Sequence, residues 1–234
     1  MNDNISPQEY VIENFVPKNQ LTIFSGDKCV GKTTLMASMI HALSTGSRFM
    51  GQETSKQECY LLTIEGEEHI GRMILAHDLA TGIKSEHHYD TCALNLDTNA
   101  DVGELYKTLT SIVGRSDNKN ITVFIDGLLH YISDFGESAA TCKATFSNLK
   151  DLLDHNPTVT IIATAYPDPA AGKIIAGSHA LTAHASTIYS LGIHGGNMEV
   201  ISEKVRFNAS PVHCAEVSIY GDPSNYTDAQ YLKY

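Results

Sequence analysis

The sequence predicts an α/β fold in which a mostly parallel central sheet is flanked by helices. Apolar runs of strand length alternate with amphipathic stretches of about 10–15 residues, which is the pattern of βαβ units. A glycine-rich loop joins the first buried strand of this alternation directly to a helix. After residue 186 three strand-like runs follow one another, so we expect antiparallel strands at the C-terminal end of the same sheet.

Continuous apolar runs predict the strands, and apolar residues repeated every three or four positions predict the helices. The predicted strands are residues 21–25, 59–64, 89–96, 121–126, 159–165, 187–191, 198–207 and 212–220. The predicted helices are residues 8–15, 31–43, 70–79, 102–112 and 144–154. Glycine and proline mark the loops between these elements.

One main domain is predicted, because 234 residues can bury a full core and no repeat or low-complexity tract divides the chain. We expect an N-terminal leader at residues 1–17, the main domain at residues 18–220 and a C-terminal tail at residues 221–234. The five cysteines form no C-x-x-C pair, so neither a disulfide framework nor a zinc site is predicted.

The composition is that of a soluble protein, with 42% hydrophobic and 18% charged residues. No apolar stretch reaches the roughly 18 residues of a membrane span, and the N-terminus lacks the pattern of a signal peptide. We therefore expect a cytoplasmic protein with no membrane partner. The net charge of −11 argues against a general electrostatic affinity for nucleic acid, although a local basic channel in an oligomer stays open.

The strongest local signal is the Walker A pattern G-x-x-x-x-G-K-T, which follows the apolar run at residues 21–24. It predicts a phosphate-binding loop (P-loop), because a predicted strand enters it and a predicted helix leaves it. Backbone N–H groups of such a loop and the positive end of the helix dipole both attract phosphate. The residues predicted to bind the nucleotide are Gly26, Asp27, Lys28, Cys29, Val30, Gly31, Lys32, Thr33 and Thr34.

The predicted cofactors are ATP and Mg²⁺. Lys32 is expected to contact the β- and γ-phosphates, and the Thr33 hydroxyl is expected to bind the metal. Asp126 ends an apolar strand, as a Walker B aspartate does, and is the second predicted metal residue. The alternative for Asp126 is a structural carboxylate that caps the following segment.

Glu65 is the candidate catalytic base. It ends the strand at residues 59–64, and ligands of parallel α/β sheets bind at the carboxyl ends of the strands. A carboxylate there can orient and deprotonate a water molecule. Glu67 and Glu68 compete for this role, although the first turn of the next helix gives them a structural purpose.

These motifs together resemble the RecA-like P-loop ATPases, especially the RepA/DnaB-type hexameric helicases and their KaiC-like relatives. The resemblance spans roughly residues 18–220 and includes the phosphate loop, the strand ending in Glu65, Arg72 and the Walker B strand. Residues 176–181, A-G-S-H-A-L, resemble the R-G-S-x-A-L segment of RepA-like members. Residues 204–206, K-V-R, resemble the K-x-R pair of DnaB-like subunits.

The resemblance implies a homo-oligomeric ring, hexameric in the family, with nucleotide bound between subunits. Arg206 would then be an arginine finger that acts on the neighbouring subunit, and Lys204 a further γ-phosphate contact. Residues 128–140 and 167–178 would face the channel, where single-stranded DNA is the implied partner. The alternative for Lys204 and Arg206 is an exposed strand end of mixed charge.

The predicted function is an ATP-binding and ATP-hydrolysing motor domain of a replicative or recombination-type DNA helicase. The alternative is a nucleotide-dependent regulatory or assembly ATPase with weak turnover and no unwinding activity. Ala176 and Ser186 stand where RepA-like proteins have arginines, and these missing arginines together with the acidic surface favour the alternative. Residues 164–166 align with the polar sensor of these proteins, commonly His or Gln, and this departure weakens the case for a fully active helicase. A small-molecule kinase is disfavoured, because residues 127–186 contain no arginine for a phosphate-clamping lid.

Overall fold

The computed structural model describes residues 9–64, 67–90, 94–168, 172, 174–177, 179–194, 197–205, 215–219 and 232–233. The strands are β1 (Tyr10–Ile12), β2 (Val16–Pro17), β3 (Leu21–Gly26), β4 (Glu58–Thr63), β5 (His88–Asp90), β6 (Ile121–Asp126), β7 (Val159–Ala165), β8 (Thr187–His194), β9 (Asn197–Val205), β10 (Ala215–Ile219) and β11 (Leu232–Lys233). The helices are α1 (Lys32–Thr45), α2 (Glu67–Thr81), α3 (Asn99–Arg115), the 3-10 helix η1 (Leu128–Tyr131), α4 (Ala139–His155) and α5 (His179–His184).

The described strands form a nine-stranded sheet in the order β11-β10-β9-β8-β3-β7-β6-β4-β5. Neighbouring strands from β8 to β5 pair in parallel, whereas β9, β10 and β11 each pair antiparallel with the preceding strand. A separate two-stranded sheet joins β1 to β2. This arrangement confirms the predicted fold class, a mostly parallel sheet with antiparallel strands at the C-terminal end.

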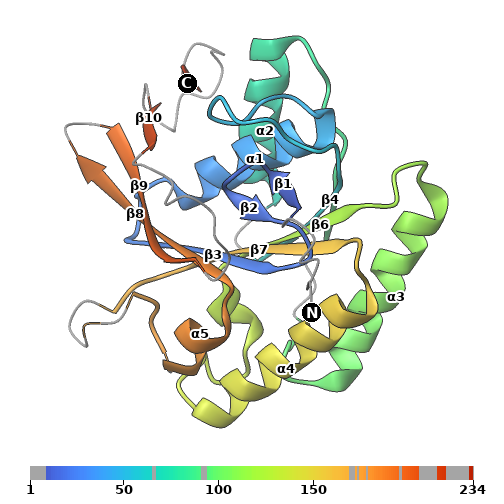
Figure 1. Cartoon of the computed structure of the whole chain (residues 1–234), viewed down its shortest axis with the longest axis vertical. Helices are drawn as coiled ribbons and strands as arrows, with labels where there is room; N and C mark the ends of the chain where they lie inside the picture. Colours follow the sequence, from blue (N-terminus) through green and yellow to red (C-terminus); the bar gives the residue numbers. More distant parts are fainter. Residues whose placement is uncertain are drawn as a thin grey trace, which may run out of the picture.

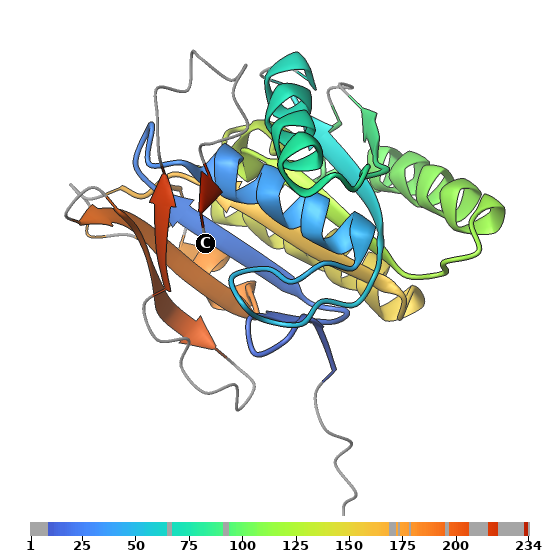
Figure 2. The same cartoon turned by 90° about the horizontal axis from the view of Figure 1, so that it is seen from above.

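Helices cover both faces of the sheet in a three-layer arrangement (Figure 1). Helices α1 and α2 lie side by side across one face (Figure 2), and α3, α4 and α5 cover the other. Because both faces are covered, β3, β6 and β7 are buried along nearly their whole length, which explains their continuous apolar runs. Alternate residues of each strand therefore belong to two different hydrophobic clusters, one on each face.

The N-terminal segment differs from its prediction. Residues 10–17 form the β1–β2 hairpin, so the predicted helix at residues 8–15 is wrong for the part that the structure describes. Asn14 adopts φ 54 in the turn, and Phe15 stacks on Tyr189 with ring centroids 4.6 Å apart. Two apolar pairs on either side of the turn are buried against the α1 face, and this tertiary burial outweighs local helix propensity. The domain limits at residues 18 and 220 stay predictions.

Two further boundaries differ. The strand predicted at residues 89–96 is confined to β5 in the described chain, and Leu96 is instead buried in a loop whose amide donates to the Tyr131 carbonyl at 2.7 Å. Helix α4 begins at Ala139, five residues before the predicted start, because Ser138 caps it by accepting from the Ala140 amide. No helix within the described residues has the length and apolarity to cross a membrane.

Candidate nucleotide-binding site

The loop between β3 and α1 has the backbone shape of a phosphate-binding loop. Cys29 and Gly31 adopt left-handed conformations, with φ 63 and φ 96, and Gly31 is the residue from which α1 begins. A Cβ atom at Gly26 would lie 2.7 Å from a Val30 methyl carbon and 3.0 Å from Leu191, so glycine is required at this close approach. Residues 27–31 form the connection from strand to helix that the Walker A pattern requires.

Lys32 lies at the first position of α1 and folds back over the loop. Its Nζ donates to the carbonyl oxygens of Gly26 and Asp27, both at 2.8 Å. The Tyr166 ring lies over the same nitrogen, 4.0 Å from Nζ to the ring centroid. Although the side chain is buried, its charge is thus compensated by carbonyls and an aromatic face and is held where a phosphate group would enter the loop.

Asp126 lies at the carboxyl end of β6, and hydroxyl groups from two other elements donate to it. The Thr33 hydroxyl donates to one carboxylate oxygen at 3.2 Å, and the Thr164 hydroxyl donates to the other at 2.8 Å. Thr164 in turn accepts from the Gly127 amide at 2.7 Å. The fold therefore brings together the two residues predicted to bind metal, Thr33 and Asp126, although 93 positions separate them in the chain.

The oxygen atoms at this place fit Mg²⁺. Hydroxyl and carboxylate oxygens are the hard ligands that Mg²⁺ prefers, and it usually binds one or two carboxylates together with substrate phosphates and water. The described residues contain no group of three or more His, Cys, Asp or Glu side chains that could hold a metal by themselves. Thr33 and Asp126 would thus hold the ion together with the phosphates, and the ion would neutralise phosphate charge there.

Two of the four predicted catalytic residues, Glu65 and Arg206, lie outside the described residues, and their roles stay predictions. The competing residue Glu68 is exposed and forms an ion pair with Arg72 one helical turn later on α2.

Lys204, on β9, contacts its own chain. Its Nζ donates to the carbonyl oxygens of Thr182 and Ala183 at 2.6 and 2.9 Å. These carbonyls lie in the last turn of α5, where a cation is favourable. The predicted contact of Lys204 with a neighbouring subunit stays a prediction.

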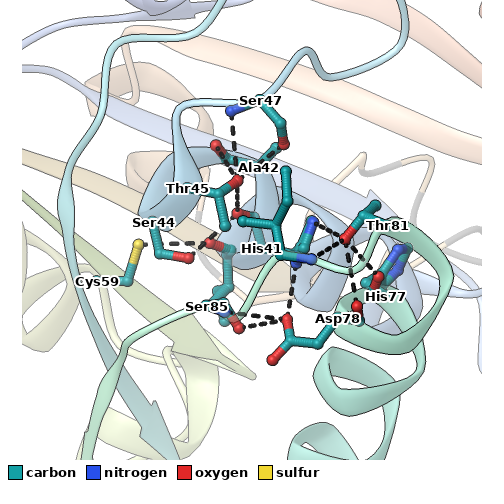
Figure 3. A network of polar contacts seen from close by, with 12 residues as sticks. His41, Ala42, Ser44, Thr45, Ser47, Cys59, His77, Asp78, Thr81 and Ser85 are labelled. Atoms are coloured by element: carbon teal, nitrogen blue, oxygen red, sulfur yellow. Dashed lines mark hydrogen bonds and ion pairs between the residues drawn. The ribbon is translucent and has the colours of Figure 1, made fainter.

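A polar network holds α1 against α2 (Figure 3). The His41 Nδ1 atom lies 2.9 Å from the Asp78 carboxylate, which also accepts from the hydroxyl and amide of Ser85 at 2.7 and 3.2 Å. His77 stacks on His41 with ring centroids 5.6 Å apart, and burial lowers the pKa of His77 to about 4. The network links the helix that begins with Lys32 to the helix that follows Glu65. The apolar periodicity that predicted these two helices did not indicate a polar network between them.

The first loop expected to face a DNA channel, residues 128–140, is acidic and only partly buried. Leu128 and Tyr131 are buried, whereas Phe135 is 59% exposed. Asp134 braces the loop by accepting from the Thr141 hydroxyl and from two backbone amides, and these hydrogen bonds lower its pKa. Only parts of the second loop are described, among them the buried Ile175.

Comparison with known proteins agrees with this geometry. A strand, a glycine-rich loop and a carboxylate at the edge of a parallel sheet are the features of a P-loop fold. Residues 1–89 match the family model described as an AAA domain. A search of curated protein sequences found no match.

A solved structure of a DnaB-like replicative helicase, described with its interactions with primase, has a similar fold. The TM-score is 0.67 at 13% sequence identity; the similarity covers 88% of this chain and 58% of that one. The chain thus spans little more than half of the helicase structure. It has the fold of the RecA-like P-loop ATPases, and the predicted resemblance to the DnaB-type helicases is confirmed at the level of the fold.

Proposed function

We propose that this chain is an Mg²⁺-dependent ATPase domain of the helicase type, which binds ATP at residues 26–34 and hydrolyses it. The observation that carries this proposal is the hydrogen bond between Thr33 and Asp126 beside the buried ammonium of Lys32. This arrangement gathers a metal-binding hydroxyl, a carboxylate and a cation at one edge of the sheet. Phosphoryl transfer depends on that kind of positioning and charge compensation.

Each residue has a separate role in the proposed reaction. Lys32 leaves the loop carbonyls and contacts the β- and γ-phosphates, while Thr33 and Asp126 hold the metal. Glu65 orients and deprotonates the attacking water. Arg206 of a neighbouring subunit stabilises the charge that develops on the γ-phosphate, and Lys204 lies beside it. These last roles require a homo-oligomeric ring.

The proposal is tested with Lys32→Ala and Glu65→Gln. We expect Lys32→Ala to weaken ATP binding, because the phosphates lose their cation. Glu65→Gln should keep ATP binding but lose turnover by about a hundredfold or more, the usual contribution of a general base. Lys150→Ala is the matched control, since Lys150 is exposed and pairs with Asp154 on the opposite face. If both variants hydrolyse ATP at the wild-type rate, the site assignment is wrong.

A second candidate is a regulatory or assembly ATPase without unwinding activity. The acidic loop at residues 128–140, with Asp134 and Glu137 and no lysine or arginine, favours this candidate because DNA phosphates repel it. Measuring ATPase rates with and without single-stranded DNA separates the two. Salt-dependent DNA binding with faster hydrolysis supports the motor, whereas tight ATP binding, slow turnover and no response to DNA support the switch.

A further inference from the structure

Three hydroxyl or carboxylate residues form a row across the sheet at its nucleotide-binding edge. Thr63, the last residue of β4, pairs in parallel register with Asp126 on β6. Thr164 on β7 lies on the other side of Asp126 and donates to it at 2.8 Å. Neighbouring residues of all three strands, two positions earlier, belong to the cluster packed under α1, so the row faces the helix that carries Lys32 and Thr33.

Thr63 differs from the other hydroxyls of this site in one respect. Its hydroxyl is buried, the residue being 1% exposed, and it has no hydrogen-bond partner in the part of the chain that the structure describes. A buried hydroxyl without a partner loses its hydration without compensation, and valine would fill the same volume without that cost. Thr33 and Thr164, by contrast, are both satisfied by Asp126.

The position of this hydroxyl indicates what could satisfy it. The hydroxyls of Thr22 and Thr187 are also buried without a partner among the described residues, but they lie opposite each other at the amino ends of β3 and β8. Thr63 lies instead at the carboxyl end of β4, next to the metal carboxylate and two positions before Glu65. Ligands of parallel α/β sheets bind at this edge.

We propose that Thr63 is a positioning residue that hydrogen-bonds a water molecule of the Mg²⁺–ATP complex. Magnesium dehydrates reluctantly and keeps several waters when it is bound through a carboxylate and phosphates. Water molecules bound to the metal donate hydrogen bonds, so the Thr63 hydroxyl oxygen would accept one beside Asp126. This inference rests on the proposed function and adds a residue to it that no Walker motif contains.

The test is Thr63→Val, followed by titration of Mg²⁺ at fixed concentration of a fluorescent ATP analogue. We expect the apparent Mg²⁺ affinity to fall about three- to tenfold, the effect of losing one hydrogen bond. Binding of the analogue in the presence of EDTA should stay unchanged. The nucleotide-free variant should be as resistant to urea as the wild type or more so, because valine removes an unsatisfied buried hydroxyl. The Thr63→Ser variant, which keeps a hydroxyl at this position, should bind Mg²⁺ with the wild-type affinity.

Thr22→Val is the matched control, because it makes the same change to a buried, unpartnered hydroxyl of the same sheet. It should leave Mg²⁺ affinity unchanged. Wild-type Mg²⁺ affinity in Thr63→Val, or an equal loss in Thr22→Val, overturns the inference alone. Lower urea resistance in nucleotide-free Thr63→Val would indicate a structural role and also overturns it. Wild-type protein whose ATP binding ignores Mg²⁺ overturns the proposed function together with this inference.

Discussion

At the scale of single residues, the orientation of one carboxylate depends on two threonines. Thr33 and Thr164 each donate to a different oxygen of Asp126, so both oxygens are held in place before any ligand arrives. The Gly127 amide donates a hydrogen bond to the Thr164 oxygen, which leaves the Thr164 hydroxyl free to donate a hydrogen bond to the carboxylate. This arrangement fixes the orientation of the carboxylate that we propose holds the metal.

We expect Thr164→Val to be destabilising, in contrast to Thr63→Val. The substitution leaves the Gly127 amide without its acceptor and one Asp126 oxygen without its donor. Because both groups are partly buried, the free energy of unfolding should fall by about 1 kcal/mol, the lower end of the cost of an unsatisfied buried group. Urea denaturation measures this change. Equal stability of Thr164→Val and wild type would contradict the hydrogen-bond pattern described above.

Alkylation of Cys29 is expected to block nucleotide binding. Cys29 is exposed in the phosphate loop, whereas Cys59 and Cys142 are buried, and burial raises the pKa of the Cys59 thiol, which makes that thiol less reactive. N-ethylmaleimide should modify Cys29 before these two, and Mg²⁺–ATP should protect it. Mass spectrometry locates the adduct, and binding of a fluorescent ATP analogue reports the effect.

A Cys29→Ser variant treated with the same reagent controls for the other cysteines. It should retain its nucleotide binding, even if Cys92 or Cys214, which lie outside the described residues, react. Full nucleotide binding by wild-type protein carrying one adduct per chain at Cys29 would disprove the expectation.

At the scale of secondary-structure elements, the contact between α1 and α2 combines apolar packing with a buried polar network. Apolar residues of both helices belong to one hydrophobic cluster, and His41 and Asp78 connect the helices through a contact of 2.9 Å. Because α1 carries Lys32 and Thr33, this network contributes to the position of the residues that we propose bind the phosphates and the metal. Its loss should therefore affect both stability and nucleotide binding.

Asp78→Ala is predicted to lower the free energy of unfolding by about 1–3 kcal/mol. The change leaves the hydroxyl and amide of Ser85 and one nitrogen of His41 without their shared acceptor. Chemical denaturation measures the loss. Asp154→Ala on the exposed side of α4 is the control, because surface ion pairs contribute at most about 1 kcal/mol. Equal effects of the two substitutions would show that the network adds nothing.

The buried ring of His77 should make the protein less stable in mild acid. Burial lowers the pKa of His77 from 6.5 to about 4. Between these values the unfolded chain binds a proton that the folded chain does not, so stability falls as the pH is lowered from about 6.5 towards about 4. His77→Phe keeps a buried ring but removes this titration. The stability of the variant relative to wild type should therefore rise on acidification, by up to about 3 kcal/mol.

Thermal or urea unfolding of both proteins at pH 7 and pH 4.5 tests this prediction. The difference between wild type and His77→Phe is the informative quantity, since all other titrating groups are common to both. Parallel pH profiles would mean that His77 is protonated in the folded protein at mildly acidic pH.

At the scale of the whole molecule, the sheet separates the two ends of the proposed inter-subunit site. The phosphate loop leaves β3 in the centre of the sheet, whereas Lys204 lies near the end of β9, two strands away. In the proposed ring, residues 204–206 of one subunit reach the phosphate loop of the next. Each active site then requires two chains.

Mixing two inactive variants tests whether the site is shared. Lys32→Ala removes the phosphate contact and Arg206→Ala removes the proposed finger, so each variant alone should be nearly inactive. In a mixed ring some interfaces combine an intact loop with an intact Arg206, and part of the ATPase activity should return. Mass in solution, measured with and without ATP, shows whether rings form. If no activity returns although mixed rings form, Arg206 does not act between subunits.

Much of the fold could be predicted because its signals are local in the sequence. The bounds of β6 and β7 agree with prediction, since buried parallel strands are uninterrupted apolar runs that end at polar residues. The phosphate loop could be predicted equally well, because a backbone that bends tightly around a phosphate group requires glycines at fixed spacing. The β1–β2 hairpin was missed, because its short apolar pairs fit a helix as well as a strand until Phe15 is seen against Tyr189.

The sequence alone determined the class of fold and the identity of Lys32, Thr33 and Asp126 as candidate site residues. Only the tertiary structure decided which side chains surround Asp126 and how Lys32 is held. Thr63 and Thr164 reach the site through the pairing of β4 and β7 with β6, and Tyr166 reaches Lys32 from the end of β7. Contacts of this kind depend on the order and register of strands that are far apart in the sequence. Strand order and register leave no periodic pattern in the amino-acid sequence.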